Sequence, residues 1–268
     1  MKRWVKIALW SVFSIGVIVL MVGVNTKVNQ RLLSSPDIHI QVAGGNAFIT
    51  KAELLHRLKI KGLIVENQRK EDLQIEKIES FIQSISQVKT VDVFQHVDGS
   101  WKIDVELREP IARIFNSHGE TFYLDSEGFI MNTTPSHTAR TVVITGEIPD
   151  KLNSISVPEI INNDSLISIH KLDDIYRISD YVCKDPLFRS LIGQMHIEKN
   201  GDFVLTPLVG DQKIIFGSAL STKQVKEKFE KLRIFYKEAM PFEGWNTYSQ
   251  ISLKYEDQIV CKKKKSNE

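Results

Sequence analysis

The chain has 268 residues, which is enough for one large domain or two ordinary ones together with an anchor or a tail. Its composition, 42% hydrophobic and 25% charged with two cysteines, excludes a disordered chain, a collagen-like chain, a polytopic membrane protein and a disulfide scaffold. The basic excess lies at the two ends, and between Asp37 and Cys261 there are 26 basic and 32 acidic residues, a net charge of −6. A nucleic-acid partner or a phosphate-binding surface is therefore not expected on the folded part.

Twenty residues without a charge, Ile7 to Thr26, form the first element. As a helix that rises ~1.5 Å per residue, this run is long enough for the hydrocarbon core of a bilayer, and it predicts a transmembrane helix. A cleaved signal peptide is the competing interpretation, but the run is longer than usual and Val22-Gly23-Val24 is a poor cleavage site. Basic residues crowd the first six positions, which favours residues 1–6 as a cytoplasmic stub and residues 27–36 as an external linker.

Residues 37–110 are predicted to form a module with the order strand, helix, helix, strand, strand. Apolar and polar residues alternate from Asp37 to Val42, and Thr50 with Glu53 is typical of a capping box that begins a helix. A second helix is predicted because isoleucines recur at helical spacing from Ile75 to Ile85. Two further strands follow around Val91–Val93 and Trp101–Leu107, with Asp98-Gly99 as the hairpin turn.

Residues 111–261 are predicted to form an α+β domain on an antiparallel sheet. Strand-like pieces are interrupted by helical runs around His170–Cys183 and Lys223–Ala239. The final predicted strand is Gln250 to Val260, because apolar and polar residues alternate along it. Residues 262–268 would be a basic tail that stays solvated, or that contacts an acidic partner or a cell-wall polymer.

The sequence contains no glycine-rich phosphate loop, no HExxH zinc motif and no Gly-x-Ser-x-Gly elbow, and its seven histidines include no pair at helical ligand spacing. We therefore expect no catalytic, cofactor or metal site, and no enzyme. Asp173-Asp174 is interpreted as a solvated helix face, and Asp125 with Glu127 as part of a hairpin that ends at Gly128. Cys183 and Cys261 could pair or remain separate thiols.

Four short stretches, in three parts of the chain, together resemble the bacterial cell-division protein family FtsQ (DivIB). Val105-Glu106-Leu107-Arg108-Glu109-Pro110-Ile111-Ala112 is similar to the end of a POTRA domain and its passage into the β domain. Tyr123-Leu124-Asp125-Ser126-Glu127-Gly128 is similar to the following hairpin, and Ile144-Thr145-Gly146 to a later strand and glycine. Ile251-Ser252-Leu253-Lys254-Tyr255 resembles the family's closing strand, although Ser252 and Lys254 replace the Asp and Arg that are frequent there.

The resemblance implies a non-enzymatic scaffold in the inner membrane, with most of the chain periplasmic and concentrated at the division septum. It also implies FtsB- and FtsL-type coiled-coil partners, through which the septal peptidoglycan synthase would be controlled. The alternatives are a POTRA-bearing adaptor for protein export or outer-membrane assembly, and a membrane-anchored enzyme on another fold.

A closing strand at the edge of a sheet could accept a partner segment as a further strand. The predicted partner-binding residues are therefore Lys254, Tyr255, Glu256, Asp257, Gln258, Ile259, Val260 and Cys261. The helix from Lys223 to Tyr236 would shape the adjoining surface. In the competing interpretation, Tyr255 and Ile259 are core residues and the partner docks elsewhere.

Overall fold

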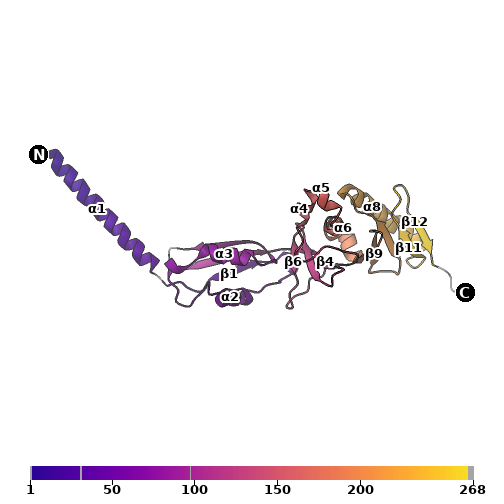
Figure 1. The fold of residues 1–268 in the computed structure, drawn as a ribbon, viewed down its shortest axis with the longest axis horizontal. Coiled ribbons are helices and arrows are strands. Elements are labelled where there is room, and N and C mark those ends of the chain that lie inside the picture. The colour runs from indigo at the N-terminus through magenta and orange to yellow at the C-terminus, as the bar shows by residue number, and fades with distance from the viewer. Residues whose placement is uncertain (1, 31, 97, 265–268) are drawn as a thin grey trace. The chain divides into compact units, whose positions relative to one another are not determined.

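The computed structural model describes residues 2–30, 32–96 and 98–264, without the side chains of residues 2, 3, 5, 6, 24–29 and 43. The chain forms two compact units. The first comprises Met1–Val42 and Ile49–Leu107, and the second comprises Ala43–Phe48 and Arg108–Glu268. Each unit has its own sheet, of three and nine strands respectively. Figure 1 shows the elements of both units.

The N-terminal helix α1 runs from Lys2 to Asn29 and contains the whole predicted span. Among the described residues, however, no helix combines the length and the apolar character that crossing a membrane requires. The helical form of the predicted span Ile7–Thr26 is confirmed, and its crossing of a membrane stays a prediction. The side chains of its last three residues, 24–26, lie outside the described part of the chain.

The first unit has the predicted order of elements. Its members are β1 (Asp37–Gln41), α2 (Lys51–Ile60), η2 (Lys70–Asp72), α3 (Ile75–Gln83), β2 (Val88–Gln95) and β3 (Trp101–Leu107). The sheet order is β1-β3-β2, with β1 parallel and β2 antiparallel to β3. The Thr50 side chain accepts the Glu53 backbone N–H at 3.1 Å, as expected for an N-cap, while the Glu53 carboxylate pairs with Arg57.

The second unit is built on one mixed sheet. Its strands are β4 (Pro110–Phe115), β5 (Thr121–Asp125), β6 (Ile130–Asn132), β7 (Val142–Gly146), β8 (Ile192–Ile197), β9 (Phe203–Pro207), β10 (Lys213–Gly217), β11 (Tyr248–Ser252) and β12 (Val260–Lys263). They follow the order β12-β11-β10-β9-β8-β7-β4-β5-β6. The α+β class is confirmed, but the sheet is not wholly antiparallel, because the pairs β4–β7, β7–β8 and β10–β11 are parallel.

Helices of the second unit pack on one face of this sheet. They are α4 (Val157–Ile161), α5 (Asp164–Ile167), α6 (Leu172–Lys184), α7 (Pro186–Leu191), α8 (Thr222–Ile234), the π-helical turn η3 (Phe235–Ala239) and α9 (Met240–Glu243). Apolar side chains of α6 and α8, such as Ile178 and Phe229, share one buried cluster with strand residues such as Ile214 and Ile251. Alternate strand residues point away from these helices, so the sheet has one covered face and one open face.

A short segment, Ala43–Phe48, covers part of the opposite face at the β5 end; its first residues form the 3₁₀ turn η1 (Ala43–Gly45). Phe48 is fully buried, with its ring 5.4 Å from that of Tyr123 and 5.0 Å from that of His137. The Nε2 atom of His137 lies 3.2 Å from Oδ1 of Asn46. Nothing in the local pattern of the sequence indicates this packing.

The structure contradicts two of the predictions about particular residues and confirms a third. The single strand expected over Gln250–Val260 is wrong, because β11 ends at Ser252 and β12 begins at Val260, with a loop between them. The solvated face expected for Asp173 and Asp174 is also wrong, because both residues are buried. The hairpin at Asp125 is confirmed: its buried carboxylate accepts the backbone N–H groups of Glu127 and Phe129 and pairs with Arg108.

Candidate partner-binding edge of the C-terminal sheet

Strand β12 is the last strand of the nine-stranded sheet and pairs only with β11 in the strand order. Figure 1 shows the two strands side by side near the C-terminus. The Lys262 carbonyl accepts the Ser249 hydroxyl at 3.1 Å, and the Lys264 N–H donates to the Thr247 carbonyl at 2.9 Å. Because successive residues of a strand direct their backbone groups to opposite sides, Cys261 and Lys263 present theirs to the free edge.

The side chains of β12 also alternate between the two faces of the sheet. Cys261 lies opposite Ile251 and is half-buried against the core on the helix side. Lys263 follows on the same side, with Nζ 3.5 Å from the Glu243 carboxylate of α9. Val260 and Lys262 point to the open face and are exposed. A segment added to this edge would therefore meet different chemistry on its two faces.

The predicted site residues fall into two groups. Val260 and Cys261 belong to β12, whereas the six residues before them form the loop that joins β11 to β12: Lys254, Tyr255, Glu256, Asp257, Gln258 and Ile259. Lys254 pairs with Asp202 at 2.6 Å, the Tyr255 side chain is about half exposed, and Ile259 packs on the core. Of the two residues that the competing interpretation places in the core, only Ile259 is there.

Helix α8 holds this loop, as the predicted role for the helix from Lys223 to Tyr236 requires. The Lys231 ammonium group donates to the carbonyl oxygens of Tyr255 and Glu256, each at 2.7 Å. One charged side chain therefore binds two consecutive carbonyl groups of the loop. The position of the loop depends on the position of α8.

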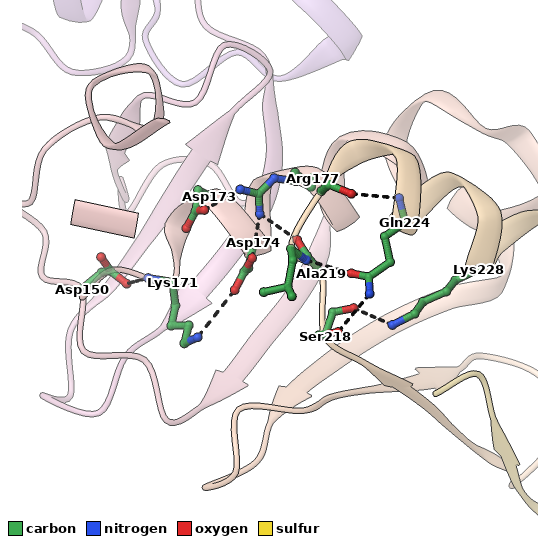
Figure 2. Close-up of polar contacts among 11 residues, drawn as sticks. Asp150, Lys171, Asp173, Asp174, Arg177, Ser218, Ala219, Gln224 and Lys228 are labelled. Carbon is green, nitrogen blue, oxygen red and sulfur yellow. Dashed lines mark hydrogen bonds and ion pairs between the residues drawn. The ribbon is translucent and has the colours of Figure 1, made fainter. Parts of the chain in front are cut away.

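A buried ionic cluster connects the start of α8 to α6. Figure 2 shows Arg177 between two carboxylates of its own helix: its guanidinium contacts Asp173 and Asp174, each at 2.6 Å, and donates to the Ala219 carbonyl at 2.7 Å. Burial and the neighbouring Asp173 charge raise the pKa of Asp174. The spacing of Asp173 and Arg177 by four residues could have indicated this pairing, but not its burial.

Lys228 completes this support on α8. Its Nζ donates to the carbonyl oxygen of Phe216 in β10 at 2.9 Å and to that of Ser218 in the turn between β10 and α8 at 2.7 Å. Figure 2 shows the contact with Ser218. The residue is almost fully buried, and burial lowers the pKa of Lys228 to about 8. A chain of contacts therefore runs from α6 through the β10–α8 turn and α8 to the loop before β12.

Exposed aromatic residues near β12 were missed by sequence reasoning. Phe242 of α9 is 88% exposed, and Trp245 is 43% exposed with its ring 5.5 Å from that of Tyr236. They follow Met240-Pro241, in a stretch without periodicity, and only a high local content of aromatic residues marks them. Large exposed aromatic side chains are enriched at protein interfaces.

The two cysteines, Cys183 and Cys261, are free thiols in the structure, and both are half-buried. Burial raises the pKa of each thiol, with Glu109 contributing at Cys183 and Glu243 at Cys261. Neither thiol is therefore activated as a nucleophile at neutral pH.

Comparison with known protein families divides the chain between two domains. Residues 109–262 match the family described as FtsQ/DivIB, C-terminal related, and residues 34–106 match the POTRA-like domain. A search of curated proteins found no match. Both matched families are non-catalytic and support a division-related scaffold. With more than half of its length matched, the chain belongs to the FtsQ/DivIB family and carries a POTRA domain.

Proposed function

We propose that the protein is a non-enzymatic scaffold of the division machinery that binds FtsB- and FtsL-type partners by strand addition at β12. Through these partners it would link early to late division proteins and control septal peptidoglycan synthesis. The observation that carries the proposal is the free edge of β12, where Cys261 and Lys263 direct backbone N–H and C=O groups away from β11.

Residues around the edge would supply specificity. Tyr255 is exposed on the loop that Lys231 holds, and Phe242 and Trp245 are exposed on and just after α9. Main-chain hydrogen bonds do not distinguish one partner from another, whereas side chains in contact with the added strand do. The domain division that the proposal uses is residues 37–110 for the POTRA-like domain and residues 111–261 for the FtsQ-type domain.

A proline at the free edge is the sharpest test. Cys261→Pro removes one outward N–H and none of the bonds to β11, and proline is tolerated on edge strands. We expect Cys261→Pro to weaken partner binding strongly. The melting temperature of the unbound protein should change little. Cys261→Ala is the matched control, because it also removes the thiol but keeps the backbone N–H of residue 261. Equal partner affinity for the two variants would exclude strand addition at this edge.

Tyr255→Ala separates the side-chain contribution from the backbone contribution. Because Tyr255 is half exposed, we expect the variant to fold normally and to bind the partner weakly. Replacing Ile259 by a charged residue should also abolish partner capture, but Ile259 packs on the core, so that variant needs a melting control. If a folded Tyr255→Ala variant captures as much partner as the wild type does, Tyr255 does not belong to the site.

Membrane attachment and septal localisation are part of the same proposal. Family membership suggests an anchored protein, and the exposed apolar side chains along α1, such as Leu9, Phe13 and Leu20, would provide the contact. We propose a single pass with the N-terminus in the cytoplasm and the bulk of the chain periplasmic. A functional fluorescent fusion should form a band at mid-cell, and depletion should give filaments or chains. Uniform envelope fluorescence with normal division would favour the export-adaptor alternative.

A further inference from the structure

The open face of the nine-stranded sheet carries a row of polar and basic side chains that runs across the strands. Lys262 lies opposite Gln250, which lies opposite Lys213, on three adjacent strands. On the other side of β9, Gln194 lies opposite Val143, and Val143 lies opposite Arg113. The two halves meet at β9, because the register of Ile214 with Leu205 places Lys213 opposite Thr206, the partner of Gln194.

These side chains are accessible, and the nearby carboxylate of Asp211 pairs with Lys264, which lies outside the row. Lys213, Lys262, Gln194 and Thr206 are exposed, whereas the residues that alternate with them, such as Ile214, are buried under the helices. Among the described residues, neither Lys213 nor Lys262 has an acidic partner. The row itself contains no carboxylate.

Arg113, at the far end of the row, forms no ion pair with any carboxylate in the part of the chain that the structure describes. Its guanidinium lies over the rings of Phe115 and Tyr123, at 5.1 and 5.6 Å, and its Nε contacts the Thr121 hydroxyl at 3.4 Å. Arg113 is half-buried beside these rings, at the end of the open face that Ala43–Phe48 partly covers, so we expect it to contribute less to binding than the exposed Lys213 and Lys262.

The geometry of the row suits a linear anion. Neighbouring strands are ~4.8 Å apart, so Lys213 and Lys262 are separated by about 10 Å, and Lys213 and Arg113 by about 19 Å. Amide and hydroxyl donors lie from Gln250 to Gln194, whereas Val143 stands between Gln194 and Arg113. Phosphate oxygens accept hydrogen bonds from charged and from neutral donors. A protein partner would instead need an apolar anchor at its centre, and the five side chains from Lys262 to Gln194 provide none.

We propose that this row, Lys262–Gln250–Lys213–Thr206–Gln194–Val143–Arg113, is a binding surface for a linear phosphate-bearing polyanion that lies across the strands. The surface goes beyond partner addition at the edge and does not depend on it. The net negative charge of the folded part does not reveal this row, because a net charge sums the carboxylates of the whole folded part with the cations of one face. The expectation that the folded part has no phosphate-binding surface is replaced by this proposal.

The test uses fluorescently labelled polyphosphate and the full chain, with binding measured by anisotropy at physiological salt. We expect Lys213→Glu and Lys262→Glu each to weaken binding by about tenfold, with an affinity that falls as salt rises. Lys263→Glu is the matched control: it makes the same charge change at the next residue, on the opposite face, and should have a much smaller effect. If the charge-reversal variants Lys213→Glu and Lys262→Glu do not fold, the neutral variants Lys213→Gln and Lys262→Gln are measured in their place.

Three results would overturn the proposal. Equal losses for Lys262→Glu and Lys263→Glu would show attraction to the lysine-rich end as a whole rather than to one face of the sheet. Equal affinity for a polyglutamate of the same charge would assign the face to an acidic protein segment. Absence of polyphosphate binding would remove the surface altogether. The Cys261→Pro variant keeps the whole row, so failure of the edge and failure of this surface are distinguishable.

Discussion

Lys231 and Tyr255 are joined by a hydrogen bond of 2.7 Å from the lysine ammonium group to the backbone carbonyl oxygen, although 24 residues separate them in the chain. The same ammonium group reaches the Glu256 carbonyl. This relationship connects α8 to the loop before the edge strand. It makes the geometry of the candidate site depend on a helix that does not itself form the edge.

We expect Lys231→Met to loosen the loop without unfolding the protein. Both bonds lie at the surface, so the loss of global stability should be about 1 kcal/mol or less. Hydrogen exchange of the backbone amides from Tyr255 to Gln258 should become faster, and partner binding weaker. Lys226→Met is the control, since Lys226 lies on the same helix and pairs only with Glu230 in the described part of the chain. Unchanged exchange in the loop would contradict the role given to Lys231.

Removing Arg177 should be strongly destabilising. Arg177→Met leaves the buried carboxylate of Asp173 without its cation and Asp174 with Lys171 alone, at 3.6 Å, which costs on the order of 3–5 kcal/mol. Adding Asp173→Asn and Asp174→Asn should recover much of this loss, because the uncompensated charges are then gone. Denaturant unfolding of the single and triple variants provides the comparison. A triple variant as unstable as Arg177→Met would show that the lost Ala219 contact, rather than the buried charge, dominates.

The raised pKa of Asp174 predicts a pH dependence of stability. In the window above its ordinary value of 3.8, the folded state retains the Asp174 proton more than the unfolded state does. Stability contributed by this group is therefore lost as the pH rises through that window. Asp174→Asn should flatten the dependence in the pH range just above 3.8, measured as the free energy of unfolding relative to wild type. Parallel curves for the two proteins would refute the assignment.

Lys228 predicts a dependence of the same kind at alkaline pH, with the opposite sign. Burial lowers the pKa of Lys228 from its ordinary value of 10.5 to about 8 in the folded state, so between these values the unfolded state binds more protons and stability rises with pH. The full effect is at most about 3 kcal/mol. Lys231 and Lys254 favour the neutral form, and Asp202 opposes it. Lys228→Met should lack the rise, whereas the exposed control Lys223→Met should retain it.

Gly146 is predicted to tolerate no side chain. Its φ is +110°, and an added Cβ would lie 2.1 Å from the Ile197 carbonyl oxygen on the neighbouring strand β8. We expect Gly146→Ala to cost more than about 3 kcal/mol. Gly201→Ala separates the two causes, because Gly201 also has a positive φ, +84°, but nothing within 4 Å, and should cost about 1 kcal/mol. Similar melting temperatures for the two variants would contradict the close approach at Gly146.

Much of the fold follows from local patterns in the sequence. The isoleucines of α3 and the Thr50 cap of α2 identify the helices of the first unit, because periodicity and capping are local properties. The closing strand shows the limit of this reasoning. The alternation from Gln250 continues past Ser252 although the strand does not, because Lys254 pairs with Asp202 and Lys231 binds the loop backbone. Neither contact can be inferred from spacing along the chain.

The buried features depend on tertiary structure in the same way. The sequence predicts that Asp173 and Asp174 form a solvated face. In the structure both are buried, and Arg177, which pairs with them, donates to the Ala219 carbonyl of the β10–α8 turn. Phe48 gives no signal of its burial against Tyr123, because the two residues are far apart in sequence. Within the candidate site, the sequence places the edge in the right part of the chain. The outward direction of Cys261 could be found only from the pairing of β11 with β12.

Hydrogen exchange at the edge strand tests strand addition most directly. In the free protein, the amides of Cys261 and Lys263 should exchange faster than that of Lys264, whose N–H is bonded to the Thr247 carbonyl. Binding of an FtsB- or FtsL-type partner should protect Cys261 and Lys263 selectively, because only their N–H groups acquire new acceptors. Partner binding that leaves both amides unprotected would contradict the account.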